Sequence, residues 1–189
     1  VIRLHHFPAN KVEITGPVQY DRFKMHLPKS RSEFLKSLNL DPSKKTILFA
    51  GGVNIHHYFD IYRVFVEQKE KVWRESFNLI IRPYPHIKLL GSPAWKMLEG
   101  MFGNSGAYIS NPSSIDATGD RTSELRMDLS FDEGPDELNY LLHYSDVMVN
   151  YFSTIGLEAA ICDLPTIHVG FDTYTFGQRY SVSTSFLQR

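Results

Sequence analysis

Short apolar segments that alternate with segments of helical periodicity are the feature that most constrains the fold of this chain. The apolar segments cover residues 46–50, 77–82, 107–110, 146–150 and 165–169. Apolar runs of this length are typical of strands buried in a parallel sheet. Because strands alternate with helices along the chain, the sequence predicts an α/β fold, a Rossmann-like parallel sheet of about five or six strands with helices on both faces.

The segments between the strands carry helix signals. Ser30 and Glu33 have the spacing of a capping box, which predicts a short helix with Phe34, Leu35 and Leu38 on one face. Apolar and aromatic residues at three- and four-residue steps predict the clearest helix, which we interpret as part of the core. That helix covers residues 58–73, and further helices are expected from Ser92-Pro93, from Pro135 and over 153–161.

Two stretches lack a steady period. Residues 1–29 are punctuated by prolines, and we expect an extended interdomain connector there, followed by an α/β domain over residues 30–189. The lack of a steady period over residues 111–131 predicts a long loop there. The chain starts at Val1 and stops inside a polar stretch, and we expect both ends to be cuts in a longer enzyme.

Charge and composition exclude several classes of function. The 189 residues carry a formal net charge of −1, so no basic excess exists to neutralise a nucleic-acid backbone. The single cysteine, Cys162, excludes an internal disulfide and Cys-rich zinc sites, and it fits a reducing, cytoplasmic compartment. No apolar run reaches the roughly 18 residues that a membrane span needs.

The turn after residue 150 carries the most informative candidate site, because ligands of open parallel sheets bind beyond the carboxyl ends of the strands. Ser153 and Thr154 open a helix whose free N–H groups and positive dipole end suit a phosphate. Gly156 lets a ligand approach the first turn. Glu158 lies four residues after Thr154 on the same face, where a carboxylate can accept both hydroxyls of a ribose.

A purely structural interpretation of this turn stays open. Ser153 or Thr154 would then be only an N-cap, and Glu158 would be only a solvated partner of the helix dipole. Capping explains the hydroxyls well. It explains Glu158 less well, because a capping box places the acidic residue three positions after the cap.

Two other strand ends offer groups for a ligand. Arg82 and His86 flank a loop fixed by two prolines, and both can face a phosphate or sugar; the alternative is a surface turn with an incidental cation. Gly51 and Gly52 follow the first predicted strand and let the backbone approach a ligand, although turns use glycine routinely. The spacing is not the dinucleotide fingerprint Gly-x-Gly-x-x-Gly.

Other kinds of site are not indicated. His5-His6 and His56-His57 are adjacent pairs and not the i, i+4 pairs that share a metal on a helix, so we expect no metal. The chain has no Gly-x-Ser-x-Gly elbow. Cys162 follows an apolar helical segment and is interpreted as core packing. No cofactor is expected.

The order of several short motifs extends over most of residues 12–170. In chain order they are Thr15-Gly16-Pro17, Tyr20-Asp21-Arg22-Phe23, Phe49-Ala50-Gly51-Gly52, Arg82-Pro83-Tyr84-Pro85-His86, Glu137-Leu138, Tyr144-Ser145-Asp146-Val147, Asn150-Tyr151-Phe152-Ser153-Thr154-Ile155-Gly156-Leu157-Glu158-Ala159-Ala160 and Leu164-Pro165-Thr166-Ile167. This order resembles the C-terminal, donor-binding domain of GT-B-fold transferases. The nearest resemblance is to the branch that holds CDP-glycerol glycerophosphotransferases, with UDP-N-acetylglucosamine 2-epimerases as more distant relatives.

The resemblance implies roles for the candidate residues. Ser153 and Thr154 would meet the donor diphosphate, and Glu158 would meet the ribose. Arg82 and His86 would face the donor's phosphate or the transferred group.

The sequence departs from the family pattern at two positions. Tyr84 stands where the proline loop often has a histidine, and Asn150 stands in place of the usual aspartate. Both departures leave the transferred group undefined. The acceptor half of such enzymes commonly supplies the catalytic base, so no catalytic residue is assigned.

The expected function is that of the donor-binding domain of a glycosyltransferase or glycerophosphotransferase. It would bind a nucleoside-diphosphate sugar or polyol for cell-surface polysaccharide synthesis, without an essential metal, because a helix dipole and hydroxyls stabilise the leaving diphosphate. The expected partners are the donor and a missing N-terminal acceptor-binding domain, through which the enzyme would associate peripherally with a membrane. This chain alone is expected to be inactive. The alternatives are a sugar-nucleotide 2-epimerase-like enzyme and a non-catalytic nucleotide-binding module.

Overall fold

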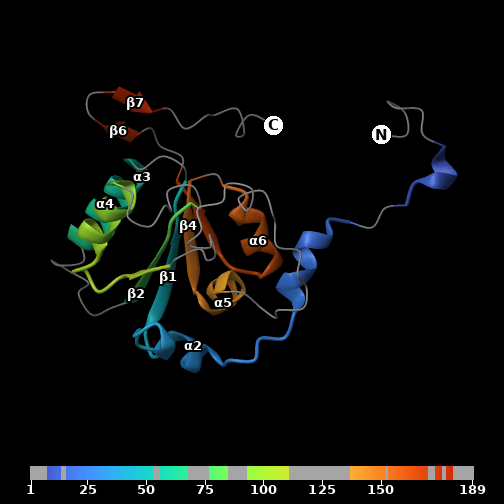
Figure 1. Cartoon of the computed structure of the whole chain (residues 1–189), viewed down its shortest axis with the longest axis horizontal. Coiled ribbons are helices and arrows are strands. Elements are labelled where there is room, and N and C mark those ends of the chain that lie inside the picture. The colour runs from blue at the N-terminus through green and yellow to red at the C-terminus, as the bar shows by residue number, and fades with distance from the viewer. Residues whose placement is uncertain are drawn as a thin grey trace.

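The structure is a computed structural model, and it describes nine stretches of the chain. These are residues 8–13, 16–52, 56–67, 77–84, 93–110, 137–151, 153–169, 173–175 and 178–180. A parallel sheet lies between two layers of helices (Figure 1).

Five parallel strands make up the sheet, in the order β3-β2-β1-β4-β5. Their bounds are β1 (Lys45–Ala50), β2 (Phe77–Arg82), β3 (Tyr108–Ile109), β4 (Val147–Asn150) and β5 (Thr166–His168). Each strand agrees with its predicted bounds to within one residue at either end. The predicted α/β class is therefore confirmed. An antiparallel pair that the sequence did not predict follows, β6 (Thr173–Thr175) and β7 (Gln178–Tyr180).

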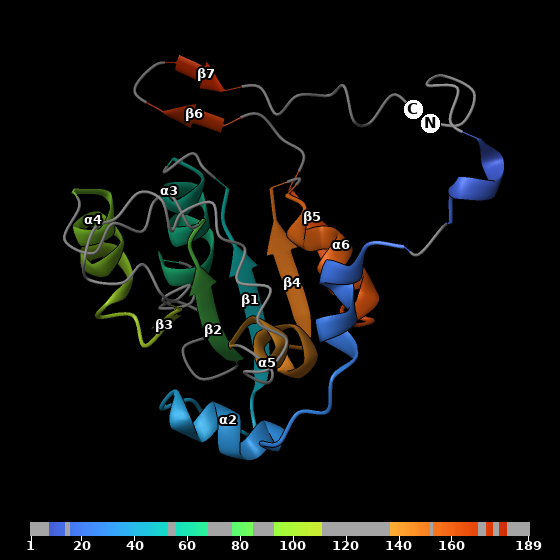
Figure 2. The same cartoon turned by 45° about the vertical axis from the view of Figure 1, so that its right-hand side comes forward.

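Helices cover both faces of the sheet, as predicted. Figure 1 shows α3 (His56–Tyr62) and α4 (Pro93–Phe102) on one side of the strands, and α5 (Glu137–Tyr144) and α6 (Ile155–Ile161) on the other. The helix α2 (Arg31–Ser37) lies by the start of β1, at the amino ends of the strands (Figure 2). The predicted helix over 58–73 is found as α3, which continues as a π-helical turn over Arg63–Glu67; its remaining residues lie outside the described stretches.

Alternation along the strands separates two hydrophobic cores. One set of strand residues faces α5 and α6, namely Leu48, Ala50, Ile80 and Met148. The intervening residues face α3 and α4, namely Phe49, Leu79, Ile81 and Val149. Because neighbouring side chains of a strand point to opposite faces, a sheet buried on both sides needs such continuous apolar runs.

The start of α2 carries the predicted capping box. The Ser30 N–H donates to Glu33 Oε2 at 2.8 Å, and the Glu33 N–H donates to Ser30 Oγ at 3.3 Å. Phe34 and Leu35 are buried, as predicted, and Phe34 stacks on Tyr140 of α5 with ring centroids 4.9 Å apart.

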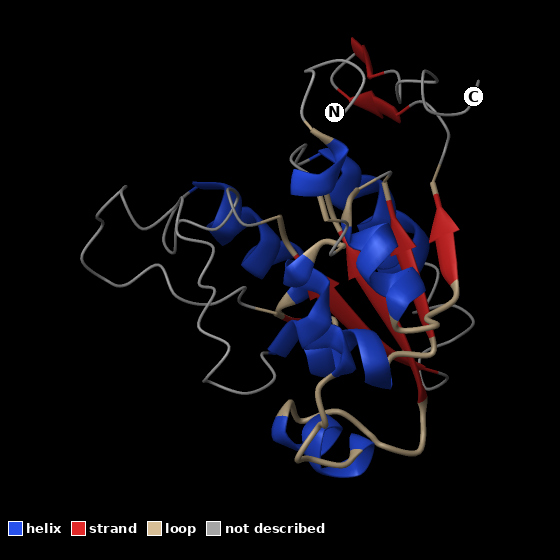
Figure 3. Ribbon diagram, turned by 90° about the vertical axis from the view of Figure 1, so that its right-hand side faces the viewer, coloured by secondary structure: helices blue, strands red, loops and turns tan. Residues whose placement is uncertain are grey.

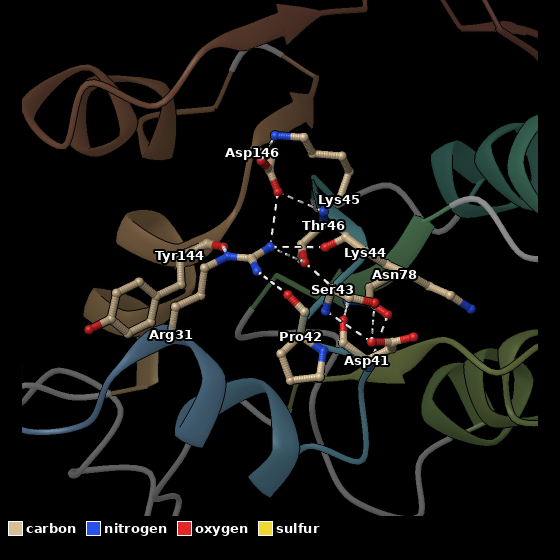
Figure 4. Close-up of polar contacts among 10 residues, drawn as sticks. All are labelled: Arg31, Asp41, Pro42, Ser43, Lys44, Lys45, Thr46, Asn78, Tyr144 and Asp146. Carbon is tan, nitrogen blue, oxygen red and sulfur yellow. Dashed lines mark hydrogen bonds and ion pairs between the residues drawn. The ribbon is translucent and has the colours of Figure 1, made fainter.

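Arg31 fastens α2 to the amino end of the sheet (Figure 4). Its guanidinium donates to the carbonyl oxygens of Pro42 at 2.6 Å, Lys44 at 3.0 Å and Tyr144 at 3.1 Å. The same group pairs with the Asp146 carboxylate at 3.1 Å. A planar guanidinium with five donors suits this group of converging acceptors. These contacts fix the amino ends of β1 and β4, at the opposite edge of the sheet from the candidate site.

The expectation of extended backbone in the first 29 residues is wrong over residues 18–24. That stretch forms a 3-10 helix, η2 (Val18–Lys24), and a shorter turn, η1 (Ala9–Lys11), precedes it. Three-residue turns bring Tyr20 and Phe23 to one side, and Phe23 is only 2% exposed within the core that α6 also joins. Figure 3 views the molecule from the side of η2 and α6, with helices in front of the strands. The boundary between residues 29 and 30 stays a prediction.

Candidate functional site

One rung at the carboxyl edge of the sheet joins four strands. Ala50 at the end of β1 is paired with Arg82 of β2 on one side and with Asn150 of β4 on the other. Asn150 is paired in turn with His168 of β5. Paired residues of parallel strands project to the same face, and Ala50 belongs to the core beneath α5 and α6. The three polar residues of this edge rung therefore face α5 and α6.

The edge rung lies one pleat beyond an apolar rung of Ile80, Leu48 and Met148. On β2 and β4 this face thus changes from an apolar to a polar side chain at the last position. The change coincides with the topological switch point, because β2 lies to one side of β1 and β4 to the other. Crevices at such points are where open α/β sheets bind ligands.

Arg82 is held in a polar network. Its Nη1 donates to Ser110 Oγ at 3.0 Å and lies 3.5 Å from Glu137 Oε2 in an ion pair. The Glu137 carboxylate also accepts a hydrogen bond from the Tyr108 hydroxyl at 2.7 Å and one from the Ser110 hydroxyl. The guanidinium is thereby fixed in direction at the strand end. Glu137 belongs to the Glu137-Leu138 motif of the sequence, but the sequence did not predict its contact with Arg82.

The Glu137 carboxylate is used as an acceptor from several sides, so it acts as a positioning group. Burial raises the pKa of Tyr108, and its hydrogen bond to Glu137 raises that pKa further, so this hydroxyl remains a donor. Arg82 and Glu137 are 15% and 25% exposed in their side chains. An ion pair that is partly withdrawn from solvent holds its geometry better than a surface pair.

Asn150 is fully buried, at 0% exposure, and neither atom of its side-chain amide has a hydrogen-bond partner within the described stretches. Buried polar atoms are almost always paired, and an unpaired one costs about 1–3 kcal/mol. Its Nδ2 lies 3.3 Å from the point where a Cβ on Gly156 would stand, and His168 Cε1 lies 3.0 Å from that point. Asn150, Gly156 and His168 therefore meet where β4 and β5 end against α6.

Gly51 has a packing reason to be glycine, and Gly52 beside it takes part in a contact between two strand ends. A Cβ on Gly51 would lie 2.1 Å from the Tyr58 ring, which is fully buried. The Tyr58 hydroxyl donates to the Gly52 carbonyl at 3.2 Å and accepts from the Tyr84 N–H at 3.0 Å, so it ties together the ends of β1 and β2. Both glycines lie at the predicted edge, and Gly51 is required by the fold whether or not a ligand approaches.

Aromatic rings line the other face of the same edge. His57 stacks on Tyr151 with ring centroids 3.9 Å apart and planes inclined by 6°. Tyr151 and Tyr58 each pack edge-on against Phe49. Burial raises the pKa of Tyr151, and the nearby Asp60 adds to this, so its hydroxyl stays protonated. These rings close the α3 face of the edge, which leaves the α5 and α6 face as the polar one.

The turn after β4 places Ser153 and Thr154 at the start of α6. Thr154 occupies the N-cap position, but its side chain makes no capping hydrogen bond. Neither hydroxyl has a hydrogen-bond partner within the described stretches. The sequence left open that Thr154 is only a helix cap. Its side chain does not cap α6 in the structure.

Glu158 lies one turn further along α6 and has a partner in the N-terminal segment. Its Oε1 is 4.0 Å from Arg22 Nη2, and the guanidinium of Arg22 also lies 4.8 Å from the centroid of the Phe23 ring. Glu158 thus helps to hold η2 against α6. The contact of Glu158 with a ribose stays a prediction. A ribose at this position would share the carboxylate with Arg22.

The structure brings together most of the residues that the sequence singled out. At one edge of the sheet, Gly51 and Gly52 follow β1, Arg82 ends β2, and Ser153 and Thr154 come after β4. Glu158 is directed to η2, while His86 and the loop over 111–131 lie outside the described residues. Sequence reasoning missed His168; the signal for it was a histidine near the end of a short predicted strand.

Two shallow hollows elsewhere on the surface do not coincide with this edge. One lies between η2 and α6, lined by Gly16, Pro17 and Tyr20 among others, and one lies at the amino ends of the strands. Within the described stretches, no group of three or more His, Cys, Asp or Glu side chains is arranged to hold a metal. None of the helices described there is long and apolar enough to cross a membrane.

Comparisons with known proteins give a distant structural likeness. No family model matches the chain, and no curated protein matches it. Structures of the wall teichoic acid polymerase TagF with CDPG are similar, with TM-scores of 0.44 after a 30 minute soak and 0.43 after a 15 minute soak. In both, the identity is 14% over 74% of this chain and 26% of the polymerase chain. The chain thus spans about a quarter of that protein. The assignment of the α/β fold is based on the strand order of this chain.

Proposed function

We propose that this chain binds a nucleoside-diphosphate sugar or polyol at the carboxyl edge of its sheet, as the donor-binding part of a transferase. The observation that carries the proposal is the position of Arg82 at the switch point, on the same edge of the sheet as the turn that holds Ser153 and Thr154. The order of motifs that resembles GT-B donor domains supports the same assignment. The transfer step, the acceptor and the second domain belong to this proposal too.

The diphosphate is assigned to the turn after β4. The Ser153 and Thr154 hydroxyls are not used by the described part of the fold, so a ligand can take both as donors. Arg82 lies two strands away on the same edge, and its planar guanidinium suits a phosphate oxygen. Glu137 and Ser110 hold Arg82 in direction, so little side-chain entropy remains to be lost on binding.

Isothermal titration with CDP and with UDP, in the presence of EDTA, tests the proposal. Binding without a metal is the expected result. Ser153→Ala and Thr154→Val should each weaken binding by about 1 kcal/mol, the typical net contribution of one hydrogen bond. Their melting temperatures should stay close to that of the wild type, since Thr154 makes no capping bond.

Ser32→Ala is the matched control, because it removes one hydroxyl from α2 at the opposite edge. It should leave the affinity unchanged. The absence of binding of either nucleotide at millimolar concentration, or equal losses in Ser32→Ala and Ser153→Ala, would contradict the assignment.

A further inference from the structure

The side-chain amide of Asn150 is the feature of this edge that the diphosphate site does not use. It is fully buried, and both its donor and its acceptor lack partners in the described part of the chain. An asparagine in such a position costs stability, whereas leucine, with the same number of side-chain heavy atoms, would cost none. A group that destabilises the free fold is expected to have a partner when the site is occupied.

The surroundings of the amide indicate where that partner enters. Asn150 and His168 are paired across β4 and β5, so their side chains leave the sheet on the same face. A Cβ on Gly156 would lie 3.3 Å from Asn150 Nδ2 and 3.0 Å from His168 Cε1, so only a glycine lets the first turn of α6 lie this close to the two side chains. His168 is the exposed member of the group, so a ligand would reach the amide from the side of this residue.

The chemistry of an amide selects the ligand. Asn150 offers an N–H donor and a carbonyl acceptor side by side. A hydroxyl can both accept and donate, so neighbouring hydroxyls satisfy the two halves of the amide together. An ionised phosphate only accepts, and it would leave Asn150 Oδ1 unpaired in a buried position. An imidazole such as that of His168 is also a suitable partner for a hydroxyl.

We propose that Asn150 and His168 form a subsite for neighbouring hydroxyls of the sugar or polyol that the donor carries. This inference rests on the proposed function, because it locates the transferred group relative to the diphosphate at Ser153 and Thr154. Asn150 stands three residues before Ser153, so the two parts of the ligand would bind close together along the chain. The subsite would make the chain prefer a donor to the nucleoside diphosphate alone.

The test compares each donor with its parent nucleotide in the wild type and in Asn150→Leu. The probes are CDP-glycerol with CDP, and UDP-glucose with UDP, measured by isothermal titration. In the wild type, one donor should bind about tenfold more tightly than its parent, which equals about 1.4 kcal/mol. In Asn150→Leu that advantage should disappear, while the affinity for the parent nucleotide stays within about twofold.

Thermal unfolding of the same variant provides a second readout. Asn150→Leu should raise the melting temperature by about 2–4 °C, because an unpaired buried amide is removed. A fall of several degrees would show that the fold itself uses the amide, and it would overturn the subsite. Ser145→Ala is the control, since its hydroxyl is also buried and without a partner in the described stretches but lies at the amino end of β4.

The outcomes separate the subsite from the proposed function. If CDP and UDP bind but neither donor has an advantage, or if Asn150→Leu keeps the advantage, the subsite is wrong and the diphosphate site stands. If Ser145→Ala loses the advantage as well, the effect is not local and the subsite is wrong. If neither nucleotide binds to the wild type, both proposals fall.

Discussion

Removing the Asp146 carboxylate should weaken the amino end of the sheet by an amount that the structure allows to be worked out. Asp146 accepts hydrogen bonds from Lys45 Nζ at 2.7 Å, from the Thr46 N–H at 2.9 Å and from Arg31 Nη2 at 3.1 Å. The side chain of Lys45 is 80% exposed, so this contact adds at most about 1 kcal/mol. The two less exposed contacts add about 1 kcal/mol each.

Asp146→Ala should therefore lower the free energy of unfolding by about 2–3 kcal/mol, or the melting temperature by about 5–10 °C. Urea unfolding at neutral pH, followed by circular dichroism, measures the change. Asp21→Ala, which removes an exposed carboxylate of η2, is the matched control and should change stability by less than about 0.5 kcal/mol.

The pH dependence of the free energy of unfolding provides a second test of the contacts of Asp146. Burial raises the pKa of Asp146, but the hydrogen bonds from Lys45 and Thr46 and the charges of Lys45 and Arg31 outweigh it, so the pKa lies below the ordinary value of 3.8. A lowered pKa means that this stabilisation is complete above pH 3.8 and is lost as the pH falls through the folded-state pKa. The difference in the free energy of unfolding between the wild type and Asp146→Ala should thus narrow in acid. A gap below about 0.5 kcal/mol at pH 7, or one that stays constant into strong acid, would refute the reasoning.

Three other substitutions test residues around the candidate site. Gly51→Ala should lower the free energy of unfolding by about 1–3 kcal/mol, since the new Cβ would overlap the buried Tyr58 ring; an unchanged urea midpoint would show that the ring moves freely. Glu137→Gln should weaken nucleotide binding by titration, because Arg82 loses its ion pair, and Glu99→Gln on α4 should have no effect; equal effects would dismiss the positioning role. Glu158→Gln should weaken CDP binding by about 1–3 kcal/mol and change stability by less than about 1 kcal/mol, since the pair with Arg22 is partly exposed; a lower melting temperature with unchanged affinity would make Glu158 structural.

The strands and their direction could be predicted from the sequence because the signal is local. Each apolar run is bounded by residues that end a strand, and a sheet buried on both faces needs such runs. The capping box at Ser30 is equally local, since donor and acceptor lie three residues apart. The candidate residues Arg82, Ser153 and Thr154 follow from the same rule, because all of them lie at or shortly beyond the carboxyl ends of strands.

The register between strands could not be predicted, and the edge rung depends on it. Arg82, Asn150 and His168 are 68 and 18 residues apart along the chain, and only the pairing with Ala50 brings them into one row. The contact of Glu137 with Arg82 is also long-range. The sequence offers Gly51 as a place where a ligand can approach the backbone, and only the position of Tyr58 shows that packing requires glycine there. Helical turns in residues 18–24 were missed because Tyr20 and Phe23 gain their burial from distant elements.

The central claim is that a nucleoside diphosphate binds at the carboxyl edge of the sheet. An NMR titration of the isotopically labelled chain with CDP, followed through backbone amide shifts, tests it most directly. The account predicts shift changes concentrated at residues 50–52, 82–84, 150–151 and 153–156, with little change at 41–46 at the amino edge. Shift changes centred on the amino edge, or none at millimolar CDP and UDP, would contradict it.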